Sequence, residues 1–306
     1  MSSNLFSMTS VLRFLKKCNK FNQEISKSLA KIGRIELLNE MESLKREKIY
    51  TYYNQFLEFF KNRVDFIIEC IEIESLNKEI LEPLLRGLIE IYCRILFLSN
   101  SSDEEKLKKI IWQELYICAL SDYKLKSNKS LAAFISINYK ILQDIKVSLP
   151  VFPKIRQIVQ ESLRKIIQKS SQKIRRNQEF TKWNKQYGFP SVAKIIRDSL
   201  DEREEPIISK YQLYRLYSRL SEQIHADPYL EYTNHNSKDT GKYRIIAFLL
   251  IIYLKFLREI AKKAKMEKDI EELVKEASEF KEDFLLFWGF SKQLSIEKAK
   301  AKKTNK

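Results

Sequence analysis

The chain is poor in glycine and proline, with five and six of these residues in 306. Typical proteins contain about 7% glycine and about 5% proline, the residues on which tight turns depend. The shortage argues against a fold of many short strands and turns, and indicates a few long elements. Because 44% of the residues are hydrophobic, the chain can bury a substantial core, and disorder as the overall state is excluded.

Cysteine and histidine are also scarce. The chain has four cysteines, with no Cys-x-x-Cys pair, and only two histidines to complete a metal site. We expect Cys18, Cys70, Cys93 and Cys118 to be reduced thiols in the core. Gly-rich phosphate loops, His-Glu-x-x-His and Gly-x-Ser-x-Gly are absent as well, so neither a cofactor nor a bound metal is expected.

Long hydrophobic runs are missing too. The longest, residues 245–254, is about half of the roughly 20 residues that a membrane-spanning helix needs. Near the N-terminus, polar residues interrupt the apolar positions before a signal-peptide core can form. We therefore expect a cytoplasmic protein that does not interact with a membrane.

Positive charge is abundant and unevenly placed. The formal net charge is +16, and residues 154–185 contain ten basic and two acidic residues, while residues 292–306 contain six lysines and one glutamate. Local excesses of this kind attract phosphate-rich partners. RNA is the expected polyanion, and the residues predicted to bind it are Arg164, Lys165, Lys169, Lys173, Arg175, Arg176 and Lys182. The alternative is that both stretches are ordinary solvated faces.

Apolar residues recur at spacings of three and four through nearly the whole chain, which is typical of helices. The sequence predicts an all-α multi-helix bundle. The expected helices span residues 21–75, with a break near Lys48, and then 77–98, 103–121, 130–145, 154–179, 208–226 and 243–264. Residues 183–206 are expected to be less regular, apart from a short helix that begins at Ser191.

The domain boundaries follow from the same pattern. Residues 1–20 are interpreted as an N-terminal segment, 21–264 as the bundle domain, and 265–306 as a charged helical extension with a Lys-rich tail. Core positions expected in the first long helical stretch are Leu37, Leu38, Met41, Leu44, Tyr52, Phe56, Phe60, Phe66 and Ile67.

One polar pair stands inside a strongly apolar helix. Arg86 and Glu90 are four residues apart, so they share a helix face and can form an ion pair. A charge in such surroundings must be paired, because an unpaired buried charge costs several kcal/mol. The pair is either a structural element that sets helix register or a device that positions a partner side chain or a phosphate.

A second constellation runs from Tyr211 to His225. Leu213, Leu216, Tyr217, Leu220 and Ile224 form an apolar stripe, and Tyr214, Ser218, Ser221 and His225 form a polar stripe beside it. His225 stands near the expected helix end, one turn after Ser221. An imidazole there is either a proton carrier or a hydrogen-bonded packing residue.

The Arg-x-x-x-Glu helix, the region of Trp183 and the motif Tyr211-x-x-Tyr-Arg-x-x-Ser-x-x-Ser-x-x-x-His225 resemble an uncharacterised bacterial family, domain of unknown function 5677. The resemblance covers roughly residues 54–256. That family is similar in turn to the helical HEPN group, which includes abortive-infection and toxin ribonucleases with an arginine, four to six residues, and a histidine. In this chain five residues separate Arg219 from His225.

The resemblance implies metal-independent cleavage of RNA. His225 would exchange a proton with the attacking 2′-hydroxyl or the leaving oxygen, and Arg219 would stabilise charge on the phosphate. It also implies a site shared across a homodimer. Helix geometry agrees, since six positions place Arg219 and His225 about 120° apart around one helix.

Three functions therefore remain. The first is a HEPN-like ribonuclease toxin of a phage-defence system, with His225, Arg219, Ser221, Arg86 and Glu90 as the predicted catalytic residues. The second is a non-catalytic RNA-binding module. The third is a helical module for a protein partner, and an antitoxin is one such candidate.

Overall fold

The computed structural model describes residues 8–33, 39–73, 78–120, 128–146, 178–199, 210–224 and 240–287, in which every regular element is an α-helix. The all-α class predicted from the sequence is confirmed for these ranges. The helices are α1 (Met8–Gly33), α2 (Glu40–Glu72), α3 (Lys78–Ser99), α4 (Asp103–Leu120), α5 (Asn128–Asp144), α8 (Gln178–Tyr187), α9 (Val192–Ser199), α10 (Lys210–Ile224), α12 (Thr240–Ala264) and α13 (Glu267–Phe287).

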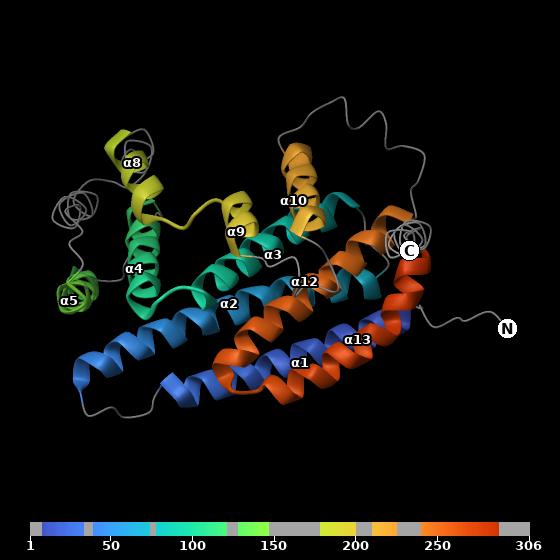
Figure 1. The fold of residues 1–306 in the computed structure, drawn as a ribbon, viewed down its shortest axis with the longest axis horizontal. Helices are drawn as coiled ribbons and strands as arrows, with labels where there is room; N and C mark the ends of the chain where they lie inside the picture. Colours follow the sequence, from blue (N-terminus) through green and yellow to red (C-terminus); the bar gives the residue numbers. More distant parts are fainter. Residues whose placement is uncertain are drawn as a thin grey trace, which may run out of the picture.

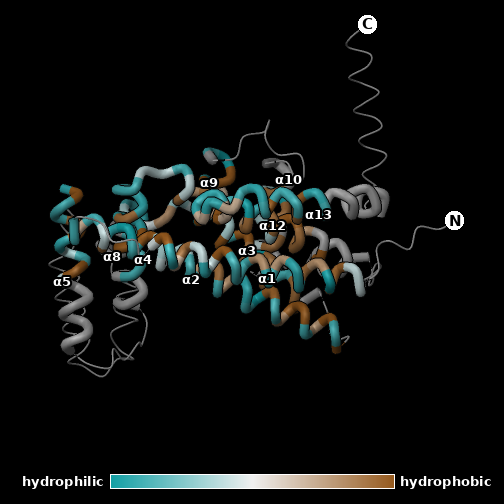
Figure 2. Tube along the Cα trace, turned by 90° about the horizontal axis from the view of Figure 1, so that it is seen from below, coloured by the Kyte–Doolittle hydropathy of each residue, from teal (hydrophilic) through white to brown (hydrophobic). Residues whose placement is uncertain are grey.

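The long helices lie lengthwise against one another, and the shorter ones gather at one end and on one side (Figure 1). α12 contacts α1, α3 and α13, while α2 packs against α1 and α3. α9 and α10 both rest on α3, and α8 docks on α4. The tube is hydrophobic where α3 and α12 lie together (Figure 2), so the main core is a helix-on-helix interface.

A buried polar network joins three of the long helices inside this core. The Tyr253 hydroxyl of α12 donates to Asn19 Oδ1 of α1 at 2.5 Å. Asn22 Nδ2 donates both to Tyr253 Oη and to the Leu57 carbonyl of α2, each at 3.2 Å. Because a buried polar group without a partner costs about 1–3 kcal/mol, the network fixes how α1, α2 and α12 sit together.

The first helical break lies earlier than the sequence predicted. α2 runs without interruption through Lys48, so the predicted break there is wrong, and α1 instead ends at Gly33. Asn39 caps the next helix, because its side chain accepts a hydrogen bond from the Met41 N–H at 2.9 Å. Gly33 also lets α1 approach α2, since a Cβ there would lie 3.2 Å from Tyr50 Cβ.

Most expected core positions of α2 are buried, and one faces solvent. Tyr52, Phe56, Phe60 and Ile67 belong to the core. Phe66 is 44% exposed, so its predicted burial is wrong. α2 carries apolar residues around most of its circumference, and spacing alone does not say which of them meet another helix. Of the remaining candidates Met41 and Leu44 are half-buried, and Leu37 and Leu38 lie outside the described residues.

The helices at the two ends of the described chain pack into the same bundle. α1 begins at Met8, continues across residue 20 and buries Phe14 and Leu15. α13 buries Ile270 against its neighbours, and its Glu276 pairs with Lys17 of α1 at 2.6 Å. Residues 8–20 and the first half of α13 are therefore structural parts of the bundle.

The other predicted helices agree with the structure to within three residues at each end where they are described. The predicted helix over 154–179 lies outside the described residues, apart from its last two positions, which open α8. α8 then extends to Tyr187, further into the region expected to be irregular. Trp112 of α4 holds it in place by donating a hydrogen bond to Asn184 Oδ1 at 3.0 Å.

Candidate functional site

The Arg86–Glu90 pair predicted from its spacing is present on α3. Arg86 Nε lies 3.2 Å from Glu90 Oε1, and the two side chains are 21% and 35% exposed. The pair is thus neither sealed in the core nor fully solvated. α3 owes this position to its sequence, because Leu81, Leu85, Leu88 and Ile89 bury the opposite side of the helix.

The helix of the Tyr211–His225 motif contacts the Arg86–Glu90 pair through Tyr217. The Tyr217 hydroxyl of α10 donates a hydrogen bond to Glu90 Oε1 at 3.4 Å, and the Arg86 guanidinium carbon lies 5.8 Å from the centre of the Tyr217 ring. One turn further along α10, Ser221 Oγ donates to the Tyr217 carbonyl at 2.8 Å. Two motifs separated by 127 positions in the chain are therefore in direct contact.

A second arginine approaches from α2. The Arg63 guanidinium lies over the Phe59 ring, 3.6 Å from its centroid, which is a close cation–π contact. The guanidinium lies against α3 at Gly87, where a Cβ would be in van der Waals contact with Arg63 Nε at 3.4 Å. Burial lowers the pKa of Arg63, and the Glu90 carboxylate acts in the opposite direction.

We call Arg63, Arg86, Glu90 and Tyr217 the arginine–glutamate cluster. It contains two guanidinium groups and one carboxylate, so it carries a surplus of one positive charge at neutral pH. Its residues come from three helices: α2 carries Arg63, α3 carries Arg86 and Glu90, and α10 carries Tyr217. A partly exposed surplus of this kind suits an anion, since arginine binds phosphate in a bidentate geometry.

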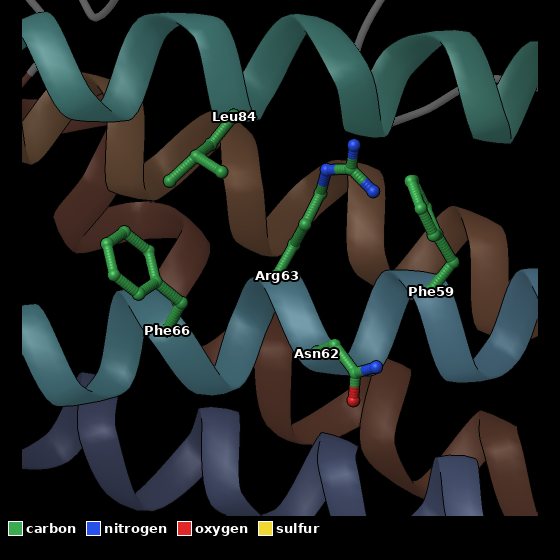
Figure 3. A pocket seen from close by; sticks show the side chains of 5 residues that line it. All are labelled: Phe59, Asn62, Arg63, Phe66 and Leu84. Carbon is green, nitrogen blue, oxygen red and sulfur yellow. The ribbon is translucent and has the colours of Figure 1, made fainter. Parts of the chain in front are cut away.

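A shallow hollow adjoins the cluster on the side of α2. It has a volume of about 390 Å³ and is lined by Phe59, Asn62, Arg63, Phe66 and Leu84. Figure 3 shows Arg63 and Phe59 reaching from α2 toward α3, with Leu84 pointing down from α3 and Asn62 pointing away from α3. Arg63 therefore belongs both to the cluster and to the lining of the hollow.

The structure joins some of the predicted catalytic residues and leaves others undescribed. Arg86 and Glu90 are in contact, and Ser221 is held on α10 one turn from Tyr217. Arg219 lies in α10, but its side chain is not among those described, and His225 lies just beyond the described end of the helix.

Of the predicted RNA-binding residues, Lys182 is exposed on α8, a helix that Figure 1 places beside α4 and away from α10. The others lie outside the described residues, namely Arg164, Lys165, Lys169, Lys173, Arg175 and Arg176.

Sequence reasoning missed Arg63 and the polar contact of Tyr217. Tyr217 packs against the core from the apolar stripe of its helix, as expected, and its hydroxyl also reaches Glu90. Arg63 carries no local signal, because its partners Gly87 and Glu90 lie on another helix. The glycine inside an otherwise apolar helix was the available sign, since such a residue commonly marks a close approach.

Among the described residues no group of three or more His, Cys, Asp or Glu side chains could hold a metal ion. None of the helices described is both long and apolar enough to span a membrane. No known protein family, curated protein or solved structure matches this chain. The resemblance to the family of unknown function and to the HEPN group thus stays a hypothesis from the motifs.

The Arg86–Glu90 pair can be tested by a double-mutant cycle. Arg86→Met and Glu90→Gln are each expected to lower the free energy of unfolding, with a coupling of about 0.5–1 kcal/mol for a partly exposed pair four residues apart. The measurement is urea unfolding at low salt and at about 0.5 M salt, where screening reduces the coupling. Strictly additive effects at low salt would contradict the pairing.

Proposed function

We propose that this protein is a HEPN-like, RNA-directed protein and that it acts as a metal-independent endoribonuclease toxin in phage defence. The observation that carries the proposal is the contact between Tyr217 and Glu90, at 3.4 Å. It joins the Arg-x-x-x-Glu helix to the helix that leads to His225. Two of the motifs behind the resemblance to the family of unknown function thus meet in one locality of the fold, as a shared site requires.

The charge of this locality supports a phosphate ligand. Arg63 and Arg86 outnumber Glu90, and Arg63 lies at the edge of an open hollow. Guanidinium groups held at a partly dehydrated surface stabilise charge on a phosphate more strongly than mobile surface lysines do.

The chemistry proposed for the site involves only groups of the chain and the RNA. His225 accepts the proton of a ribose 2′-hydroxyl while its oxygen attacks the adjacent phosphorus, and the bond to the 5′-oxygen breaks. The products are a 2′,3′-cyclic phosphate and a 5′-hydroxyl, which takes up a proton from a protonated imidazole or from water. Arg219 stabilises the charge on the phosphate oxygens. On a regular helix Arg219 and His225 would be about 120° apart, so the mechanism needs either a second chain that completes the site or a distorted helix end.

A non-catalytic role in RNA binding is the competing proposal, and one observation favours it. The same Glu90 oxygen already accepts from Arg86 and from Tyr217. Such an arrangement holds α3 against α10 whether or not a substrate is bound. This proposal predicts salt-dependent RNA binding without turnover.

The decisive experiment incubates the purified protein with labelled single-stranded RNA in the presence of EDTA. We expect cleavage with cyclic phosphate ends, identified by mass spectrometry, and a loss of about 10²–10⁴-fold in rate for His225→Ala. His235→Ala is the matched control, since it replaces the other histidine of the chain and is expected to keep full activity.

Each result has a defined meaning. Equal cleavage by wild type and His225→Ala would identify a contaminating nuclease and remove the catalytic proposal. RNA binding without cleavage by the wild type would support the non-catalytic proposal. No binding at about 50 mM salt would end both, because phosphate contacts are strongest at low salt.

A further inference from the structure

The hollow beside the arginine–glutamate cluster continues an apolar stripe along α2. Phe59 and Phe66 are seven residues apart on α2, and Ile73, the C-cap of the helix, follows seven residues later; they are 49%, 44% and 71% exposed. Residues at this spacing lie on one face of a helix, so they form a row. Large exposed apolar side chains in a row differ from the scattered ones that every surface carries, and they mark an interaction surface.

One edge of this stripe is acidic. Glu58, Asn62 and Glu69 follow the outer side of α2, beside the row of aromatic residues, and all three are exposed. The only lysine of this stretch, Lys61, is already paired with Asp65 at 2.5 Å. Arg63 is stacked on Phe59 inside the hollow. The outer edge therefore presents two carboxylates about 16 Å apart, given the rise of about 1.5 Å per residue.

The acidic edge decides which kind of molecule could bind along this stripe. A nucleic-acid backbone would bring phosphates against Glu58 and Glu69, which is repulsive. A second copy of this chain fits poorly as well. An antiparallel pairing of two α2 helices that sets Phe59 against the other copy's Phe66 also brings the two acidic edges together, with Glu58 offset from the other copy's Glu69 by only about 3 Å along the axis. An apolar segment flanked by lysine or arginine would pack its apolar side chains on the stripe and pair its basic side chains with Glu58 and Glu69.

We propose that the surface formed by Phe59, Phe66, Leu84, Glu58 and Glu69 is a docking groove for an amphipathic helix of another protein, with apolar residues on one face and basic residues beside them. Its apolar side chains lie over Phe59 and Phe66, and its basic side chains pair with the two glutamates. Helix-in-groove recognition commonly uses anchors at such spacings. This inference does not depend on RNA cleavage, although the hollow and the arginine–glutamate cluster share Arg63.

The test uses a fluorescein-labelled 18-residue helical peptide with leucines on one face and lysines at the flanking positions. A second peptide has glutamate at every lysine position. We expect the lysine peptide to bind, as measured by fluorescence anisotropy at about 50 mM salt, and Phe59→Ser/Phe66→Ser to weaken binding about tenfold or more. Ile137→Ser on α5 is the control, since it removes an exposed apolar residue from another helix.

A charge exchange makes the test independent of the aromatic residues. Glu58→Lys/Glu69→Lys is expected to weaken binding of the lysine peptide and to strengthen binding of the glutamate peptide, with unchanged helicity by circular dichroism. Equal binding of the two peptides to the wild type, or no binding at concentrations of about 200 μM, overturns the proposal. A dimer that the Phe59→Ser/Phe66→Ser variant dissociates would assign the groove to a second copy. Binding of oligouridine that this variant loses would assign it to RNA.

Discussion

Replacing Phe60 by alanine is expected to lower the free energy of unfolding by about 3–5 kcal/mol, the range for a buried phenylalanine. Phe60 has no exposed surface and stacks on two rings of α12, with centroid distances of 4.8 Å to Tyr253 and 4.1 Å to Phe256. The substitution would leave a cavity between α2 and α12 and remove both ring contacts. Tyr253 also anchors the polar network to Asn19, so the cavity threatens those hydrogen bonds as well.

The neighbouring residue provides the control. Phe59 is half exposed, and Phe59→Ala is expected to cost about 1 kcal/mol or less, mainly through its contact with Arg63. Urea unfolding followed by circular dichroism measures both variants. Equal losses of stability at positions 59 and 60 would contradict the structure, in which α2 buries Phe60 and exposes Phe59.

Lys255→Met is expected to stabilise the protein by about 1–3 kcal/mol at pH 6. Lys255 is buried on α12, and burial lowers its pKa from 10.5 to about 7; Arg258 acts in the same direction and Glu259 opposes them. A charged amine in this position carries a desolvation cost that a methionine of similar shape avoids.

The pH dependence follows from the direction of this shift. Below about pH 7 the lysine is protonated in the folded and the unfolded state, and the folded state bears the full cost of burying the charge. Between about pH 7 and the ordinary lysine pKa of 10.5 the unfolded state binds more protons, so this contribution makes stability rise with pH. The advantage of Lys255→Met should accordingly be large at pH 6 and shrink toward pH 9.

Thermal unfolding at pH 6, 7.5 and 9 provides the measurement, with Lys140→Met as the control at an exposed lysine of α5. The interpretation of Lys255 would be wrong if Lys255→Met were less stable than the wild type at pH 6. It would also be wrong if the difference between the two proteins were the same at all three pH values.

Residues that interact within one helix could be predicted from the sequence. Arg86 and Glu90 are four residues apart, and their ion pair has the expected form. Ser102 likewise caps the first turn of α4, with its Oγ accepting from the Glu105 N–H at 3.3 Å. These contacts depend on helix geometry over a single turn, which any helical sequence shares.

Contacts between helices could not be predicted in the same way. Tyr217 meets Glu90 from a helix 127 positions away, and Arg63 reaches Gly87 from another. Phe60 and Phe66 are the same residue type on the same helix, yet one has no exposed surface and the other faces solvent. An apolar pattern around most of a helix leaves its orientation open, because burial depends on which neighbours arrive and at what angle.

The sequence by itself determined the helical class of this protein, the approximate helix limits and the local pairs, because these depend on backbone propensity and on spacing within a turn. The tertiary structure decided which face of α2 is buried, that two distant motifs share one locality, and that a second arginine joins them. Those features come from packing between elements far apart in the chain, where the free energy of burial depends on shape and partner and is not encoded in any single segment.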